Sequence, residues 1–489
     1  MNMLRTLSVV LGILLIFGCA DVSKENQFQT GCSEGSESTP ENVYVPPAPA
    51  PAPTVTYWTQ QIGTNQNEIG NDLIVTGTGN IYLSGSTSGD FDNYTNADVG
   101  RGGAGYEDIL VLKYNTSGSK IWSKQLGVAN LDNFFSYIFL PGQENTPYGR
   151  EQGKSITADS NENIYITGII SNNLNGENNN GNIDAYIIKY DSNGALKWTR
   201  MLGTSANDGG YGIYVDGSNN IFITGRTDGD ISGSNAGGRD GFLAKYDING
   251  NQIWIKQFGT DSDDEGSGVI SDTSGNIYVT GITSGSLPSY TNAGLEDIFI
   301  IKYDTNGNIV WTQQLGTSTR DYCYDITIDS NNNLYITGYT WGDLDSNING
   351  GSKDVFITKY SSAGVKQWTK LLDSEYSGTA DWDEAYGIAV DSSDNVYITG
   401  FTDGNLGDKT SSNGFRDFFI AKYDSNGNKK WVRQVAAGGA NITRGRSIAI
   451  DSSNNIFVTG DTNGSLDQKT SYGMYDTFIL KYDTDGNRQ

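Results

Sequence analysis

From residue 54 onward, short apolar runs alternate with clusters of turn-forming residues. One unit is clear at 212–216, 221–225, 242–246 and 253–258, where four apolar runs are bounded by Asn, Asp and Gly. Runs of about five residues with such boundaries are typical of β-strands joined by tight turns. The pattern therefore predicts an antiparallel meander of four short strands, with a longer polar loop between the second and the third.

The same unit repeats seven times along the chain. A tryptophan in the fourth run marks every repeat: Trp58, Trp122, Trp198, Trp254, Trp311, Trp368 and Trp431. A Lys-Tyr pair that ends the third run marks every repeat again, with its lysine at Lys113, Lys189, Lys245, Lys302, Lys359, Lys422 and Lys481. Because both markers keep the same order through all copies, chance is excluded.

The repeats predict a closed ring. A four-stranded unit of this period is typical of a β-propeller blade. A fourth-strand run at 57–62 precedes the first full set, and the last repeat stops after its third run and a turn. We expect the N-terminal run to complete the last blade, because closure leaves no unpaired strand edge. The prediction is all-β: a seven-bladed β-propeller with four antiparallel strands per blade, over residues 54–489.

The N-terminus has the pattern of an export signal. One charge, Arg5, precedes an apolar run at 7–17 that is too short to span a bilayer as a helix. We predict a signal peptide over residues 1–18 and a Pro/Ala-rich tether over residues 19–53, where a polyproline II segment acts as a semi-rigid spacer. A cysteine, Cys19, directly follows the predicted signal peptide and would suit a lipid-attachment signal. The alternative is an ordinary secretory signal, with Cys19 present by chance.

Composition narrows the chemistry. The chain has 489 residues, no histidine and a formal net charge of −25. Without histidine, a Ser-His-Asp triad, a Cys-His dyad and a His-ligated zinc or haem are excluded. The excess of acids argues against nucleic-acid binding, which requires Lys and Arg at phosphates. Cys19, Cys32 and Cys323 form neither a disulfide framework nor a metal-spaced cluster, and Cys323 is expected as a small core residue.

Three motifs recur in the repeats: Asp-x-x-x-Asn-Ile-Tyr-x-Thr-Gly, Asp-x-Phe-Ile-x-Lys-Tyr-Asp and Asn-Gly-Asn-x-x-Trp. With them, residues 54–489 resemble the seven-bladed β-propeller repeat family of bacteria, the SBBP repeat. The resemblance implies the architecture and says little about activity. Separately, the segment Ile16-Phe17-Gly18-Cys19 resembles a bacterial lipobox, which implies cleavage before Cys19, a lipid on its thiol and membership of the lipoproteins.

Loop lengths predict which face of the propeller carries function. In a propeller, the loops from the second to the third strand and from the fourth strand to the next blade share one face, which we call the long-loop face. Those loops are long and variable here, whereas the turns on the opposite face are short and nearly invariant. Because binding residues usually lie on variable loops of a fixed scaffold, we assign recognition to the long-loop face.

Two aromatic features fall on this face. An insertion over 128–152 holds an apolar run with the candidate partner-binding residues Phe134, Phe135, Tyr137 and Phe139. It predicts a partner-binding or lid element, and the alternative is a loop folded over its own blade. Trp341 and Trp382 lie outside the repeat register, and neighbouring exposed aromatics bind sugars or proteins. The alternative is that each tryptophan caps its own blade.

A repeated acid is the third feature of this face. Two residues before the expected start of the first strand, six of the seven repeats carry an acid: Glu68, Glu151, Asp208, Asp264, Asp321 and Asp383. Around the axis these acids would form a candidate cation ring or an electrostatic funnel at the channel mouth. The alternative is that each acid accepts hydrogen bonds from loop amides or the neighbouring blade. We expect no cofactor, and calcium at this ring is the one option that the residues leave open.

Other repeated polar residues are expected to be structural. An aspartate opens the third strand of every repeat, and the repeated lysine shares a face with apolar residues. A half-buried lysine requires a carboxylate, so we expect a lattice of these aspartates and lysines between strands or blades.

These patterns favour a monomeric, exported lipoprotein of the bacterial cell envelope, anchored in the outer membrane or at the cell surface. Its propeller is expected to bind a protein or a glycan without catalysis. The alternative is a histidine-independent carbohydrate-active enzyme, because paired carboxylates can hydrolyse glycosides. Two carboxyl groups on one face beside Trp341 or Trp382 would favour that alternative.

Overall fold

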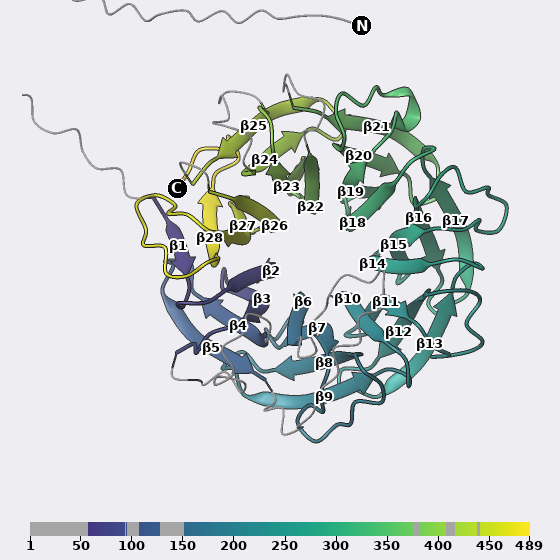
Figure 1. The fold of residues 1–489 in the computed structure, drawn as a ribbon, viewed down its shortest axis with the longest axis horizontal. Helices are drawn as coiled ribbons and strands as arrows, with labels where there is room; N and C mark the ends of the chain where they lie inside the picture. The colour runs from purple at the N-terminus through teal and green to yellow at the C-terminus, as the bar shows by residue number, and fades with distance from the viewer. Residues whose placement is uncertain are drawn as a thin grey trace, which may run out of the picture. The chain divides into compact units, whose positions relative to one another are not determined.

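Strand pairing gives each repeat the predicted meander. The computed structural model describes residues 57–92, 94, 107–127, 151–374, 382–406, 416–437 and 441–489. Over these residues, twenty-eight strands form seven four-stranded sheets arranged as blades around one axis (Figure 1). Blades 1 to 6 comprise β2–β5, β6–β9, β10–β13, β14–β17, β18–β21 and β22–β25, and blade 7 comprises β26, β27, β28 and β1.

The innermost strands are β2 (Glu68–Val75), β6 (Glu151–Ala158), β10 (Asp208–Val215), β14 (Asp264–Ser271), β18 (Asp321–Ile328), β22 (Asp383–Val390) and β26 (Thr443–Ile450). The second strands are β3 (Ile81–Thr87), β7 (Ile164–Ile170), β11 (Ile221–Thr227), β15 (Ile277–Thr283), β19 (Leu334–Thr340), β23 (Val396–Thr402) and β27 (Ile456–Thr462). The third strands are β4 (Asp108–Tyr114), β8 (Asp184–Tyr190), β12 (Asp240–Tyr246), β16 (Asp297–Tyr303), β20 (Asp354–Tyr360), β24 (Asp417–Tyr423) and β28 (Asp476–Tyr482). The outer strands are β5 (Lys120–Leu126), β9 (Leu196–Leu202), β13 (Gln252–Phe258), β17 (Ile309–Leu315), β21 (Lys366–Leu372), β25 (Lys429–Val435) and β1 (Thr59–Ile62), and a short 3-10 helix, η1 (Leu344–Ser346), follows β19.

The N-terminal strand closes the ring, as the sequence predicts. Strand β1 pairs with β28 in antiparallel register, from Thr59 opposite Leu480 to Ile62 opposite Thr477. In Figure 1 the first strand lies beside the last one. The all-β, seven-bladed prediction is therefore confirmed, with the N-terminal strand supplying the outer strand of blade 7.

The repeated Thr-Gly of the second strand is explained by a close approach of the backbone. In blade 3, a Cβ added to Gly225 would lie 1.8 Å from the carbonyl oxygen of Gly209 on the innermost strand. The preceding Thr224 is fully buried, and its hydroxyl donates to the carbonyl of Phe242 at 2.8 Å. Only glycine leaves room for the two strands, and the threonine satisfies a buried carbonyl.

The repeated tryptophan joins neighbouring blades. The indole of Trp198 in blade 2 packs against Gly250, a turn residue of blade 3 with a φ of +80°. The same contact recurs at every boundary, including Trp58 of blade 7 against Gly118 of blade 1, where φ is +81°. A glycine suits this turn twice, because it adopts a positive φ freely and leaves space for the indole.

The repeated lysine has a partner that differs from the expected one. Lys189 Nζ lies 5.0 Å from the ring centre of Tyr165 and donates to the carbonyl of Ile248, in the next blade, at 3.0 Å. Where a carboxylate approaches, it comes from the turn after the first strand, as in Lys359–Asp329 at 3.6 Å. The aspartate that opens the third strand instead accepts from a glutamine, as in Gln257 to Asp240 at 2.8 Å. The expected lattice of those aspartates with the lysines is therefore wrong, because an aromatic face and a turn carbonyl already stabilise the ammonium.

Candidate functional site on the long-loop face

The acids of the expected cation ring are buried and bonded to their own loops. Asp208 accepts from the backbone N–H of Thr204 at 2.6 Å and from its hydroxyl at 3.0 Å. Glu68, Asp264 and Asp321 make the same pair of bonds to a threonine four residues earlier. Burial raises the pKa of all four carboxyl groups. The geometry is that of an acid bonding loop amides, and a cation ring at these positions stays a prediction.

A second carboxylate lies near these acids at the boundaries between blades. The aspartate that opens the third strand of one blade approaches the acid that opens the next blade, as Asp184 approaches Asp208. Burial and this neighbouring negative charge raise the pKa of Asp184 to about 6, although two backbone N–H groups oppose the shift. Because the pair recurs between blades, its first explanation is structural, and repeated acids of this kind do not mark one catalytic blade.

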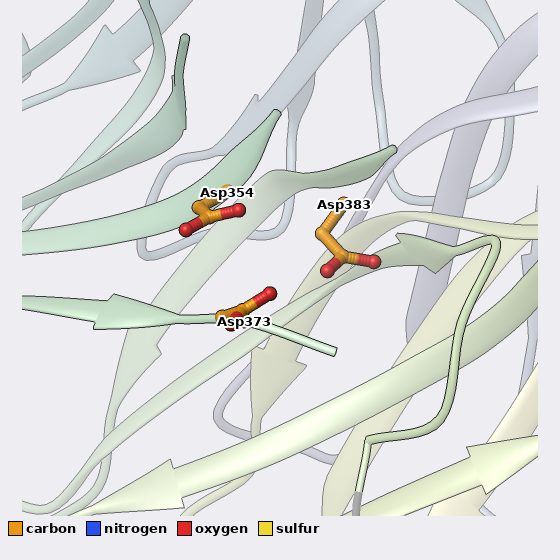
Figure 2. Close-up of side chains that lie close together, drawn as sticks. All are labelled: Asp354, Asp373 and Asp383. Atoms are coloured by element: carbon orange, nitrogen blue, oxygen red, sulfur yellow. The ribbon is translucent and has the colours of Figure 1, made fainter. Parts of the chain in front are cut away.

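One boundary differs from the others, between blades 5 and 6. There Asp373 follows the outer strand at the position where blades 1 to 4 carry a glycine. It joins the buried pair Asp354 and Asp383, and one carboxylate oxygen from each lies within 4.8 Å of the others. Figure 2 shows the three side chains converging from three segments of the chain. Carboxylates this close repel one another unless a proton or a cation lies between them.

A β-bulge places one extra residue on every innermost strand. In blade 3, Gly210 pairs with Gly225 and Gly212 with Thr224, so Tyr211 has no partner in the ladder. Bulges redirect side chains and are frequent beside functional sites. The seven bulge residues differ in chemistry although the ladder around them repeats: Asn71, Lys154, Tyr211, Ser267, Tyr324, Tyr386 and Arg446.

The bulge residues of blades 5, 6 and 7 form a contiguous arc. The rings of Tyr324 and Tyr386 lie 4.8 Å apart between their centres, and the guanidinium of Arg446 lies 5.9 Å from the ring of Tyr386. The Tyr386 hydroxyl donates to Glu384 at 2.8 Å. Burial, followed by the charge of Glu384, raises the pKa of Tyr386, so this hydroxyl stays protonated.

Further rings extend this arc outward over blades 5 and 6. Tyr322 stacks on Tyr339 at 5.2 Å with their planes 10° apart, and Phe401 lies 6.0 Å from Tyr386. We call this cluster the aromatic ridge; it comprises Tyr322, Tyr324, Tyr339, Trp341, Trp382, Tyr386 and Phe401, of which Tyr339 and Phe401 are buried. It lies near the ends of β18, β19, β22 and β23 that meet the long-loop face.

Cations sit between the rings of the ridge. Lys353 Nζ lies 4.3 Å, 4.7 Å and 5.6 Å from the ring centres of Tyr339, Trp382 and Trp341, and it forms an ion pair with Glu384 at 2.6 Å. Such cation–π contacts hold the two tryptophans around one ammonium. The structure thus brings Trp341 and Trp382 together, and the lysine that joins them was not foreseen.

A pair of arginines continues the site into blade 7. Arg444 and Arg446 both bond the carboxylate of Asp461, which is fully buried. The guanidinium of Arg444 also lies 5.6 Å from the ring of Tyr475. Two guanidinium groups share one carboxylate, so the pair keeps an excess positive charge.

Deeper along the innermost strands lie two half-buried carboxyl groups. Asp72 accepts from the hydroxyls of Ser155 and Ser447 at 2.9 Å and 2.6 Å, and so connects blades 1, 2 and 7. Asp325 accepts from the backbone N–H of Ile388 at 3.0 Å in the next blade. Burial raises the pKa of Asp325 to about 7, with a further contribution from the charge of Asp72. These groups bind neighbouring blades together at the axis.

Several predicted site residues fall outside the part of the chain that the structure describes. They are Phe134, Phe135, Tyr137 and Phe139 of the insertion and Cys19 of the lipobox. Most of the ridge and the arginine pair were not predicted, because repeated residues, long loops and rare tryptophans were the features that stood out in the sequence. The feature that could have identified these residues is variation: the residue type at the bulge position differs among repeats that are otherwise nearly constant.

Comparison with known proteins agrees with the repeat architecture. The curated relatives include an uncharacterized WD repeat-containing protein of Acanthamoeba polyphaga mimivirus, 25% identical over 241 residues, which are 39% of this chain and 17% of that protein. The regulatory protein FlaEY of Caulobacter vibrioides is 24% identical over 354 residues, which are 63% of this chain and 36% of that protein. The chain therefore spans well under half the length of either relative.

Solved structures with a similar fold include the periplasmic gluconolactonase PpgL of Pseudomonas aeruginosa. It is 11% identical with a TM-score of 0.46, and the match covers 81% of this chain and 98% of that one. The profile of the family described as SBBP, beta-propeller repeat, matches residues 121–175, 197–232, 253–288, 310–345, 367–407 and 430–467. These matches fall in register with the blades, and the chain belongs to the SBBP β-propeller repeat family.

Proposed function

We propose that this protein is a non-catalytic binding protein whose propeller recognises a protein or glycan partner through the long-loop face. The observation that carries the proposal is the aromatic ridge, seven rings and their cations gathered on blades 5 and 6 of an otherwise repetitive ring. Aromatic and arginine side chains dominate binding energy where proteins meet partners, and aromatic faces also stack on sugars. Trp341 is 39% exposed and so offers a ring to a ligand.

Glycan binding is tested on a glycan array with the full-length protein. We expect signals that disappear in a Tyr322→Ala, Trp341→Ala double variant and persist in Tyr57→Ala, which removes an exposed ring from the opposite face. A parallel pull-down with cell-surface fractions uses the same variants. Capture that is equal for all variants would refute recognition by the ridge.

The carbohydrate-active enzyme remains the second candidate, and Asp373 is the observation that favours it. This exposed carboxylate lies beside a buried acid pair and near Trp382 in the chain. Glycoside hydrolysis by two carboxylates needs an acid and a base or nucleophile within about 5–10 Å of each other. Release of reducing sugar that is lost in Asp373→Asn would replace the binding proposal by this one.

We further propose that the protein is an exported lipoprotein of the cell envelope that is anchored through Cys19. Tyr57 and Trp58 enter the propeller beside the C-terminus, because the Trp58 N–H donates to the carbonyl of Gln489. Strand β1 starts there, at the end of blade 7 that carries the short turns. The described part of the chain therefore begins on the face opposite the ridge. No helix among the described residues is long and apolar enough to cross a membrane.

Anchoring is tested by metabolic labelling with an alkyne fatty acid. We expect label on the wild-type chain and none on Cys19→Ser, which should appear in the soluble fraction. Cys32→Ser serves as the matched control, because it removes a thiol from the same segment. Label that survives Cys19→Ser, or membrane association without label, would contradict the lipoprotein proposal.

A further inference from the structure

The local charge changes sign where blade 7 meets the ridge. Six innermost strands begin with an acid, whereas β26 begins with Thr443, whose hydroxyl meets that of Thr462 at 3.1 Å. Arg444 follows it and pairs with Asp461 in the ladder, and Arg446 is the bulge residue without a ladder partner. In a chain of net charge −25, the two arginines therefore lie on the one innermost strand that lacks its opening carboxylate.

A third arginine adds to this charge. The carbonyl of Arg416 accepts from the N–H of Thr443 at 2.8 Å, and its guanidinium lies over Phe401 at 4.5 Å. Arg416 forms an ion pair with Asp403 at 3.6 Å, while Arg444 and Arg446 share Asp461. Three guanidinium groups thus face two carboxylates. At physiological salt, charges beyond about 8 Å are screened, so a ligand at this place meets the local positive excess rather than the acidic whole.

The arginine pair retains unused hydrogen-bonding capacity. Among the described residues, the buried Nε of Arg444 has no hydrogen-bond partner. The side chains of Arg444 and Arg446 are 19% and 25% exposed, so part of each guanidinium is accessible. A guanidinium binds a carboxylate through two parallel N–H bonds, which suits a planar anionic group.

Resting on the proposed function, we infer that the long-loop face binds a carboxylated oligosaccharide, with sugar rings against Tyr324 and Tyr386 and a uronate carboxylate on Arg444 and Arg446. The two kinds of contact lie side by side, because the guanidinium of Arg446 lies 5.9 Å from the ring centre of Tyr386. A glycan fits better than a protein here. A stable protein interface buries about 800 Å² per partner, whereas these side chains are half-buried and expose only part of their surface.

The ligand experiment uses one oligosaccharide in two charge states. Titration calorimetry of the full-length protein with tetragalacturonate is compared with its methyl ester, which keeps the sugar rings and removes the carboxylates. Oligomers of glucuronate and mannuronate are run in parallel. We expect at least one uronate to bind about tenfold more tightly than its ester, because charged hydrogen bonds are about twice as strong as neutral ones.

The protein variants are chosen so that the fold survives. Arg444→Gln leaves Asp461 with Arg446 as its partner, and Arg446→Gln leaves it with Arg444. Each is expected to weaken uronate binding about tenfold and to leave ester binding unchanged. Arg200→Gln, on the outer strand β9, is the matched control and should change neither affinity. Tyr386→Leu should weaken both ligands, because it removes a stacking face.

The outcomes separate this inference from the proposed function. Equal affinity for acid and ester, or equal loss in Arg444→Gln and Arg200→Gln, overturns the uronate inference. If Tyr386→Leu then still weakens the ester, binding at the ridge stands. Failure of all three uronates to bind overturns the inference as well, whereas ridge-dependent capture on the glycan array would keep the proposed function.

Discussion

Replacement of Gly118 by alanine tests whether the seam between the last blade and the first is as tightly packed as the internal boundaries. Gly118 has a φ of +81°, and an added Cβ would lie 2.9 Å from Nε1 and Cε2 of Trp58. Trp58 belongs to the strand segment that closes the ring, so the substitution acts where the two ends of the chain meet. Gly427 makes the same contact with Trp368 inside the ring, at 3.0 Å and a φ of +79°.

Two costs add in Gly118→Ala. A non-glycine residue in the left-handed region costs about 1 kcal/mol. Displacing a packed indole costs a further 1–3 kcal/mol, the usual range for overpacking. The variant Gly176→Ala measures the backbone cost alone, because Gly176 has a φ of +88° but a Cβ there would meet nothing within 4 Å. Gly77 has neither feature and should tolerate alanine or gain about 0.5 kcal/mol from reduced unfolded-chain entropy.

The assay is urea unfolding of the four alanine variants, followed by tryptophan fluorescence. We expect the loss of unfolding free energy to rise from Gly77→Ala through Gly176→Ala, at about 1 kcal/mol, to Gly118→Ala and Gly427→Ala at about 2–4 kcal/mol. A cost for Gly118→Ala no larger than for Gly176→Ala would show that Trp58 does not pack at the seam. The closed ring would then be refuted even if the other blades keep their contacts.

Three further predictions follow from buried and crowded groups. Folding raises the pKa of Asp184 to about 6, so its protonation stabilises the folded state by roughly 3 kcal/mol below about pH 4. This contribution is lost as the pH rises through 6. Asp184→Asn should therefore flatten the dependence of the melting temperature on pH between about pH 4 and 6. Asp373→Asn should raise the unfolding free energy by about 1 kcal/mol at neutral pH in EDTA, because it removes one of three clustered carboxylates. Asp485→Asn, at an exposed aspartate, is the control and should leave the unfolding free energy unchanged. Equal melting temperatures for the Asp373→Asn variant and the wild type would contradict this prediction. Burial raises the pKa of the Cys323 thiol to about 12, so mass spectrometry after native iodoacetamide treatment should find Cys323 unmodified and find it alkylated in urea.

The architecture could be predicted because the same sequence pattern is repeated in every blade. One copy of an apolar pattern is ambiguous between strand and buried helix, but seven copies with Trp, Lys-Tyr and a Thr-Gly or Ser-Gly pair in phase allow one structure. The seam was also predictable, since the run that contains Trp58 has no other repeat to belong to. Contact geometry was not: the sequence cannot show that Lys189 reaches a carbonyl in the next blade rather than an aspartate of its own.

The candidate site was only partly predictable for a physical reason. Trp341 and Trp382 stood out because tryptophan is rare outside the repeat register. Tyr324 and Tyr386 did not, because tyrosine is common in this chain and their role depends on a bulge that no local pattern announces. A bulge shifts the register by one residue and so moves a side chain out of the ladder. Only pairing with the neighbouring strand reveals which residue is the extra one.

In a ring of near-identical blades, selection for the fold and selection for binding act on different positions. The scaffold requires Gly225, Trp198 and their equivalents in every copy, because each blade repeats the same close strand contact and each boundary the same indole contact. A ligand that is not sevenfold symmetric cannot use such residues to choose an orientation. It needs blades that differ, and the differences accumulate at the bulges and at Thr443, the single departure from the acid ring. The same local change that removes a carboxylate leaves Arg444 and Arg446 with an excess positive charge beside the ridge. The difference between blades and the positive charge therefore favour the same side of the ring for ligand binding.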